Sequence, residues 1–182
     1  MTTSPDPQAL SLTVNDRPVG PVPVPRGTSM QEFLHEWLGL TGARMGCGQG
    51  ICNACTVMIE EEGKLPREIR TCITGAHWFE GRRVRTVEGH ARQEADGSLT
   101  LSPVQQAFVE AFAFQCGYCT PGFVTAATVL IERLRQRPVE RGQVESVVTE
   151  ALDHHICRCT GYVRYHTAVR DLVLATPGLV TA

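Results

Sequence analysis

Apolar and polar residues alternate along residues 10–14 and again along residues 19–24, a spacing that predicts two β-strands. Asn15 and Asp16 stand between the two segments, and both residue types favour tight turns. This part of the chain therefore predicts a β-hairpin.

A helical spacing follows at residues 31–38, where Phe33, Leu34 and Trp37 fall on one face and Ser29 can cap the first turn. Residues 56–59 and 82–87 then predict two further strands. A strand pair, one helix and more strands, in this order, are compatible with a small sheet that wraps around a single helix.

The second half of the chain has a different pattern. Residues 88–100 are polar and contain two glycines, so they predict a linker. After it, apolar residues recur at helical spacing, and Ser-Pro or Thr-Pro precedes two of the stretches, because proline is tolerated in the first turn of a helix. The four predicted helices are 104–112, 123–134, 144–152 and 167–174.

Eight cysteines fall into two sets of four, and the first set has the order C-x4-C-x2-C followed by one more cysteine after a gap. This is the ligand order of a plant-type [2Fe–2S] site. Gly48 and Gly50 let the loop wrap closely around a cluster, because glycine adopts positive φ and carries no Cβ. Asn53 also tolerates a left-handed conformation. The members of the set are Cys47, Cys52, Cys55 and Cys72.

The second set consists of two close pairs, each beside a predicted helix end. Its members are Cys116, Cys119, Cys157 and Cys159. Taken alone, this spacing fits either a second iron–sulfur cluster or a zinc ion held by four thiolates. The first set favours iron here, because a second redox centre makes the first one useful. Four short helices around such a site predict a compact bundle.

Composition narrows the remaining possibilities. A hydrophobic content of 42% over 182 residues allows a packed core, and a net charge of −2 gives no reason to expect nucleic acid. No stretch approaches the roughly 20 apolar residues that span a bilayer, and residues 1–10 lack the features of a signal peptide. We therefore expect a cytoplasmic protein, whose cysteines are more often metal ligands than disulfides.

No catalytic residues are recognisable. His154 and His155 precede Cys157, but eight cysteines already satisfy two clusters, so we do not expect histidine ligands. The chain has no nucleophile–base pair, no dinucleotide-binding motif and no P-loop. The chemistry is therefore expected to take place in another chain.

The cysteine segments resemble the small iron–sulfur subunit of the molybdenum hydroxylases, the family of xanthine dehydrogenase, aldehyde oxidoreductase and carbon monoxide dehydrogenase. The resemblance extends over residues 10–174. Asn53 stands where a glycine is usual and His155 where asparagine is frequent, and neither replaces a cysteine. The matching segments are GCGQG at 46–50, CT at 55–56, RTC at 70–72, QCGYCTPG at 115–122 and CRCTGY at 157–162.

The resemblance implies an α+β fold with a β-grasp, plant-type ferredoxin-like domain at 8–87, a linker at 88–100 and a four-helix [2Fe–2S] domain at 101–176. It implies two [2Fe–2S] clusters, held by the eight cysteines. It also implies a large partner subunit that binds a molybdenum–pterin cofactor, with Gln115 and Cys159 of this chain close to the pterin.

The implied function is electron transfer within a molybdenum-containing hydroxylase. Electrons would leave molybdenum through the site of Cys116 and its partners, pass to the site of Cys47, and reach FAD in a further subunit or the haem of a cytochrome. Two alternatives remain. A free-standing ferredoxin shuttle would need only the first domain, and a zinc-stapled interaction module would be colourless rather than brown.

Overall fold

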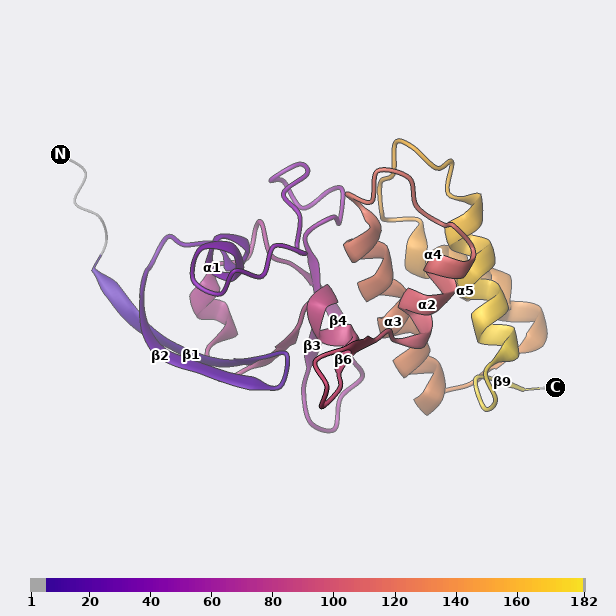
Figure 1. Ribbon diagram of the computed structural model, residues 1–182, viewed down its shortest axis with the longest axis horizontal. Helices are drawn as coiled ribbons and strands as arrows, with labels where there is room; N and C mark the ends of the chain where they lie inside the picture. The colour runs from indigo at the N-terminus through magenta and orange to yellow at the C-terminus, as the bar shows by residue number, and fades with distance from the viewer. Residues whose placement is uncertain (1–5, 182) are drawn as a thin grey trace.

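The computed structural model describes residues 6–181, which form a β-sheet part followed by a helical part (Figure 1). The prediction that residues 1–10 are not a signal peptide falls partly on residues 1–5, which lie outside the described residues. Between residues 6 and 181, no helix is both long enough and apolar enough to cross a membrane.

The first part is a five-stranded sheet with the strand order β2-β1-β5-β3-β4. Strands β1 and β5 pair in parallel, and the other neighbours are antiparallel. The predicted hairpin is confirmed: Asn15 and Asp16 both have positive φ, which suits the turn of a two-residue hairpin loop. The strands are β1 (Pro7–Val14), β2 (Arg17–Pro25), β3 (Thr56–Glu60), β4 (Arg67–Arg70) and β5 (Arg83–Arg85).

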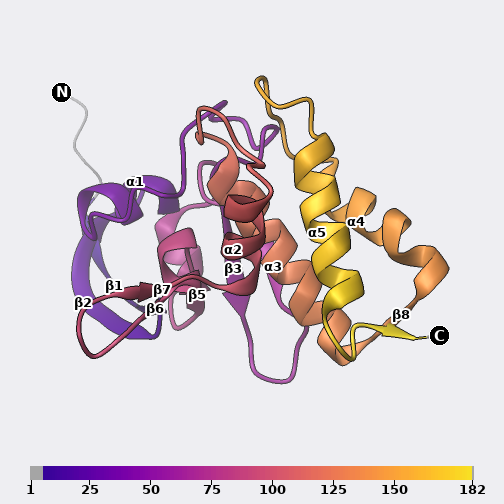
Figure 2. The same ribbon diagram turned by 45° about the vertical axis from the view of Figure 1, so that its right-hand side comes forward.

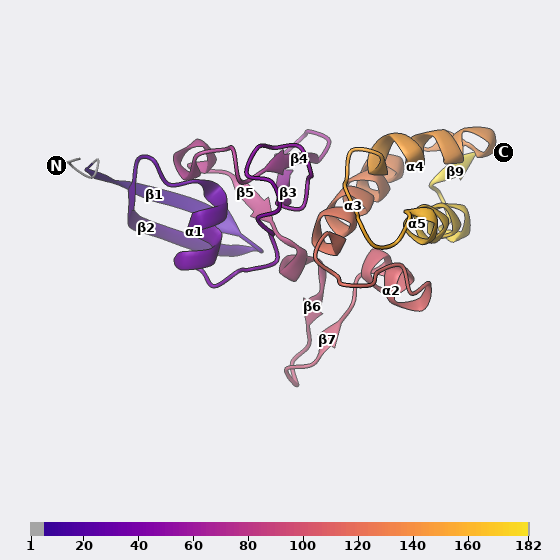
Figure 3. The ribbon, with the colours of Figure 1, turned by 90° about the horizontal axis from the view of Figure 1, so that it is seen from above.

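Helix α1 (Met30–Glu36) lies against one face of this sheet (Figure 3). As predicted, Ser29 caps it, with the Ser29 hydroxyl accepting the N–H of Glu32 at 3.1 Å. Phe33 is fully buried in the core between helix and sheet, whereas Trp37 is 39% exposed. Trp37 is the C-cap residue, so its ring reaches Phe33 only from the rim of the core.

Strand β3 joins the two parts of the molecule. Its residues from Thr56 to Ile59 are all buried, so both faces of the strand are covered. Val57 and Ile59 belong to the core under α1. The opposite face packs against α3 of the helical part, which lies beside β3 and β4 in Figure 1.

Four α-helices make up the second part within the described residues, as predicted (Figure 2). The Ser102 hydroxyl and the Gln105 side chain form a reciprocal capping box that starts the first helix. The fourth begins four residues before its predicted start, directly after Gly161 and Tyr162, which both have positive φ. The helices are α2 (Pro103–Glu110), α3 (Thr120–Gln136), α4 (Val144–Leu152) and α5 (Val163–Ala175).

The segment between the two parts contains ordered elements that its polar sequence did not predict. The strand expected at 82–87 pairs only over β5, and the chain continues into the 3-10 turn η2 (Val87–His90). A hairpin of β6 (Arg92–Gln93) and β7 (Leu99–Thr100) follows. The remaining short elements are η1 (Ala76–Phe79), η3 (Arg141–Gln143) and the parallel pair β8 (Val139–Glu140) and β9 (Val180–Thr181).

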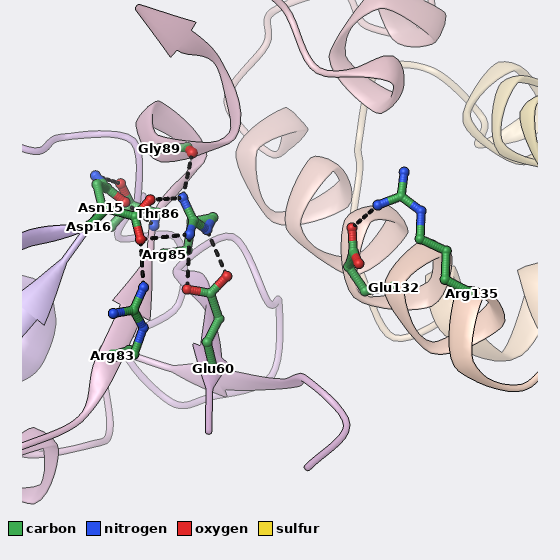
Figure 4. A network of polar contacts seen from close by, with 9 residues as sticks. All are labelled: Asn15, Asp16, Glu60, Arg83, Arg85, Thr86, Gly89, Glu132 and Arg135. Carbon is green, nitrogen blue, oxygen red and sulfur yellow. Dashed lines mark hydrogen bonds and ion pairs between the residues drawn. The ribbon is translucent and has the colours of Figure 1, made fainter. Parts of the chain in front are cut away.

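Arg85 fixes the end of the sheet from which this segment leaves. Its guanidinium donates to both carboxylate oxygens of Glu60 and of Asp16, and to the carbonyl of Gly89 at 3.1 Å (Figure 4). Charge-assisted, bidentate contacts of this kind are both strong and directional. They therefore orient the exit from β5 toward the helical part.

Candidate iron–sulfur sites

The first set of cysteines lies mainly on the loop between α1 and β3. This loop turns through positive φ at Gly48, Gly50 and Asn53, as its sequence predicted. Gly46 is required for a different reason, because a Cβ there would lie 2.8 Å from the Cys52 sulfur. The loop therefore brings its backbone against the thiols, as an iron–sulfur site demands.

Backbone N–H groups point at the Cys47 sulfur. The N–H groups of Gln49, Ile51 and Cys52 donate to this sulfur over 3.3, 3.4 and 3.5 Å. Hydrogen bonds to a thiolate favour the ionised form. The N–H groups of Cys52 and Gln49 accordingly lower the pKa of Cys47 to about 6. The loop is thus prepared to hold a thiolate, the form that binds metal.

The remaining thiol of this set, Cys72, follows β4. Burial raises its pKa to about 11, and the hydrogen-bonding neighbour that adds to the rise is Cys55. Cys47 has a corresponding neighbour in Cys52. Cys47 also acts on Cys72, so the four thiols that the sequence placed in one set come together at one site.

The second set lies between two helix starts. Cys116 and Cys119 are in the turn before α3, and Cys157 and Cys159 are in the turn before α5. The sulfur atoms of Cys116 and Cys159 are 3.6 Å apart, and both residues are exposed. Cys119 and Cys157 form a second pair, which is buried, and burial raises the pKa of Cys119 to about 12.

Four thiols at each site are the donor set of a [2Fe–2S] cluster, in which four cysteines are shared between two irons. All eight cysteines are free of disulfides. The donor set at each site is therefore suited to an iron–sulfur cluster.

The two sites face each other across a hydrogen-bonded seam. The N–H of Ile156, next to Cys157, donates to the carbonyl oxygen of Cys52 over 3.1 Å. The side-chain amide of Asn53 donates to the carbonyl oxygen of His154 and accepts from Arg70. Asn53 is only 3% exposed, so these bonds are made in the interior. The sequence predicted only a backbone role for Asn53, namely its tolerance of a left-handed conformation.

Tyr118 and Gly122 complete the seam. The Tyr118 hydroxyl donates to the carbonyl oxygen of Met45 over 2.8 Å. Gly122, in the first turn of α3, lies so close to the first loop that a Cβ there would be 2.4 Å from the Asn53 carbonyl oxygen. Glycine at this position thus permits the close approach of the two sites.

His155, which precedes the second pair of cysteines, makes its contacts with Glu68 and Phe123. His155 is buried, and its Nε2 lies 3.3 Å from a carboxylate oxygen of Glu68 on β4. Its ring packs on Phe123, at 5.1 Å between ring centres. His155 therefore belongs to the contact between the two parts of the molecule.

Gln115 is exposed, and it directly precedes Cys116, which is exposed as well. Large apolar side chains that flank the two cysteine turns in the sequence are exposed as well. They are Phe112, Phe114, Tyr118, Ile156 and Val163. An exposed apolar group of this extent is typical of a surface that binds another protein.

Two residues that lie beside thiols of the second site were not predicted from the sequence. The Thr160 hydroxyl donates to the Cys157 sulfur over 3.1 Å, and the Tyr165 hydroxyl lies 3.8 Å from the Cys119 sulfur. Thr160 lies within the CRCTGY segment, so its position next to Cys159 was an available signal. Tyr165 lies on a helix and gave no such signal.

Comparisons with known proteins agree with this geometry. A profile for a 2Fe-2S iron-sulfur cluster binding domain matches residues 13–77, and a profile for a [2Fe-2S] binding domain matches residues 86–170. The xanthine dehydrogenase iron-sulfur-binding subunit of Escherichia coli O157:H7 is 37% identical over 162 residues, which cover 89% of this chain and 92% of that protein. The nicotine 6-hydroxylase small subunit of Paenarthrobacter nicotinovorans is 36% identical, with 84% and 79% covered.

Solved structures show the same fold. Quinoline 2-oxidoreductase from Pseudomonas putida 86 superposes with a TM-score of 0.76 at 31% identity, over 95% of this chain and 93% of the matched chain. The aldehyde oxidoreductase from Desulfovibrio gigas gives a TM-score of 0.73 at 31% identity, over 95% of this chain and 18% of the matched chain. In the latter, the matched region is thus part of a much longer polypeptide.

Proposed function

This chain belongs to the [2Fe-2S] iron–sulfur subunits of the molybdenum hydroxylase family, and we propose that its eight cysteines hold two clusters that carry electrons from a molybdenum site to a further acceptor. It is the iron–sulfur subunit of a multi-subunit oxidoreductase. One cluster is held by Cys47, Cys52, Cys55 and Cys72, and the other by Cys116, Cys119, Cys157 and Cys159.

The observation that carries the proposal is the grouping of four thiols at each site together with the seam between the two sites. When bound, the clusters supply one-electron redox chemistry. The chain supplies the thiolates, the N–H donors around Cys47 and the contact between Cys52 and Ile156. These residues position and insulate the clusters, which is the part that a protein plays around a redox cofactor.

Exposure at the second site supports the proposed order of the two sites. The exposed thiols of Cys116 and Cys159 lie beside Gln115 within an exposed apolar edge. We propose that this edge binds the large molybdenum subunit and that Gln115 and Cys159 lie against its pterin. The site of Cys47 then serves the acceptor, FAD in a further subunit or a cytochrome haem. The proposed division of the chain is 8–87, 88–100 and 101–176.

A cytoplasmic location is part of the same proposal, because eight cysteines without disulfides suit a reducing compartment.

Metal analysis of the natively purified complex tests the proposal. Two four-cysteine sites require about four irons and four acid-labile sulfides per chain, and reduction must produce two distinct EPR signals. A molybdenum-containing partner must co-purify. Two irons with one zinc would refute the assignment of the second site, and a stable monomer that binds no molybdenum subunit would favour the ferredoxin alternative.

A further inference from the structure

Tyr165 on α5 is fully buried in the core of the helical part. Its ring stacks on Phe123, with 4.1 Å between ring centres and an angle of 3° between planes. Phe108 packs against it edge-on at 5.1 Å. These contacts hold the ring in one orientation, so the position of its hydroxyl group is fixed by packing.

The Tyr165 hydroxyl has two polar neighbours. Its oxygen is 2.7 Å from the hydroxyl oxygen of Thr120 and 3.8 Å from the sulfur of Cys119. Buried polar groups are normally hydrogen-bonded, and Tyr165 offers one proton. Whether Tyr165 donates to Thr120 or to Cys119 therefore depends on the direction of the hydrogen bonds among these three groups.

Metal binding fixes the role of the sulfur at one end of this chain of groups. A cysteine that ligates iron has lost its proton, so the Cys119 sulfur can only accept. The Thr120 hydroxyl can donate to the Tyr165 oxygen, which leaves the tyrosine proton for the sulfur. A phenol keeps its proton at neutral pH, because its ordinary pKa is about 10.

We propose that Tyr165 donates a hydrogen bond to the Cys119 sulfur and thereby raises the reduction potential of the cluster in the helical part. The inference rests on the proposed function. Reduction adds negative charge to a cluster, and a donor dipole directed at a ligand sulfur stabilises that added charge. The apolar surroundings strengthen the effect, because little solvent is present to screen it.

A second hydroxyl group acts on the same pair of thiols. Thr160 donates to Cys157, the neighbour of Cys119 in the buried pair. This contact lies in the turn before α5, whereas Tyr165 approaches from the core. The two donors therefore tune the same side of the site from different elements and can be varied separately.

The test is an EPR-monitored redox titration of the whole complex with Tyr165→Phe, which removes one hydroxyl group and keeps the ring packing. We expect the reduction equilibrium of the cluster held by Cys119 to shift about tenfold toward the oxidised form, which is about 59 mV for a one-electron couple. The cluster held by Cys47 must keep its potential. Thr120→Val is the matched control, because Tyr165 then still has Cys119 as an acceptor. In this variant the potential of the cluster held by Cys119 must not fall by this amount.

A second measurement uses pulsed EPR of the reduced cluster in D2O. The exchanged Tyr165 hydroxyl must add one deuterium coupling to that of Thr160, and Tyr165→Phe must lose this one coupling while the Thr160 coupling remains. An unchanged potential, or a set of couplings identical to that of the wild type in the variant, overturns the inference. Both EPR signals and full iron content in the wild type would show that the proposed function nevertheless holds.

Discussion

The main-chain N–H of Ile156 donates a 3.1 Å hydrogen bond to the carbonyl oxygen of Cys52. Cys52 belongs to the first set of thiols, and Ile156 directly precedes Cys157 of the second. One hydrogen bond thus joins a cysteine of one site to the neighbour of a cysteine of the other. The two sites are parts of one continuous bonded arrangement rather than separate modules on a linker.

The order of the sites predicts opposite effects of two cysteine variants. With Cys119→Ser, molybdenum should still be reduced by substrate, but neither iron centre should be, because the first step is interrupted. With Cys52→Ser, the cluster of the helical part should still be reduced, while transfer to the external acceptor collapses. Rapid-freeze EPR of the assembled complexes measures both.

Each variant serves as the control for the other, since each loses one cysteine ligand and the two ligands belong to different sites. Iron content and subunit composition must first show that the complex has assembled, because cluster binding contributes to folding. Normal reduction of the first-domain cluster by substrate in a Cys119 variant without its own cluster would show that the proposed order is wrong.

Asn53→Gly should weaken the seam without changing the backbone. Asn53 has φ of 57°, which glycine adopts without strain, so only the side-chain bonds to His154 and Arg70 are lost. Removing partners from buried polar groups should cost about 1–3 kcal/mol in the free energy of unfolding. Urea unfolding of the holoprotein, followed by the visible absorbance of the clusters, measures this loss.

The same variant should change the magnetic interaction between the two reduced clusters in low-temperature EPR, because their relative position is less constrained. Asn53→Asp is the matched control, since it keeps the acceptor for Arg70 and loses the donor to His154. It should give an intermediate loss of stability. If the glycine variant equals the wild type in both measurements, the seam does not depend on this side chain.

Phe112 should be central to the binding of the molybdenum subunit. It is 73% exposed, and its positive φ presents it at the turn after α2, where Arg164 donates to its carbonyl oxygen over 3.3 Å. Aromatic anchors of interfaces commonly contribute 2 kcal/mol or more. Phe112→Ser should therefore weaken assembly about 30-fold, as measured by titration of the separated subunits.

Leu99→Ser provides the comparison for Phe112. Leu99 is 64% exposed and lies on the β6–β7 hairpin, away from the cysteine turns. It should leave the affinity for the molybdenum subunit unchanged. Equal losses in both variants would indicate a general effect of surface hydrophobicity and not the proposed interface.

Cys47 should be the most reactive cysteine of the cluster-free protein. Its pKa of about 6 means that the thiolate predominates at pH 7 and increases only slightly above it, whereas Cys72 and Cys119, near 11 and 12, remain protonated. Brief iodoacetamide labelling at pH 7, read by mass spectrometry, should modify Cys47 first. In urea the faster labelling of Cys47 must disappear. If Cys119 is labelled as fast as Cys47 in the folded protein, the prediction is wrong.

Local signals predicted much of the fold. Asn15 and Asp16 placed the first turn, and Ser29 and Ser102 placed two helix starts, because turns and caps depend on residues that are close in sequence. Strand β4 was not expected, since its sequence, REIR, has little apolar alternation. It forms because its backbone pairs with β3, a contact that only the assembled sheet provides.

The cysteine spacing and the glycines of the first loop, on their own, determined the two sets of thiols, because both depend on the local path of the backbone. Only the tertiary structure decided how the thiols pair, that Asn53 reaches a carbonyl 101 positions away, and that Tyr165 approaches Cys119. These contacts join segments that are distant in sequence. They exist because α3 packs on β3 and α5 packs against the core, and no spacing along the chain encodes that packing.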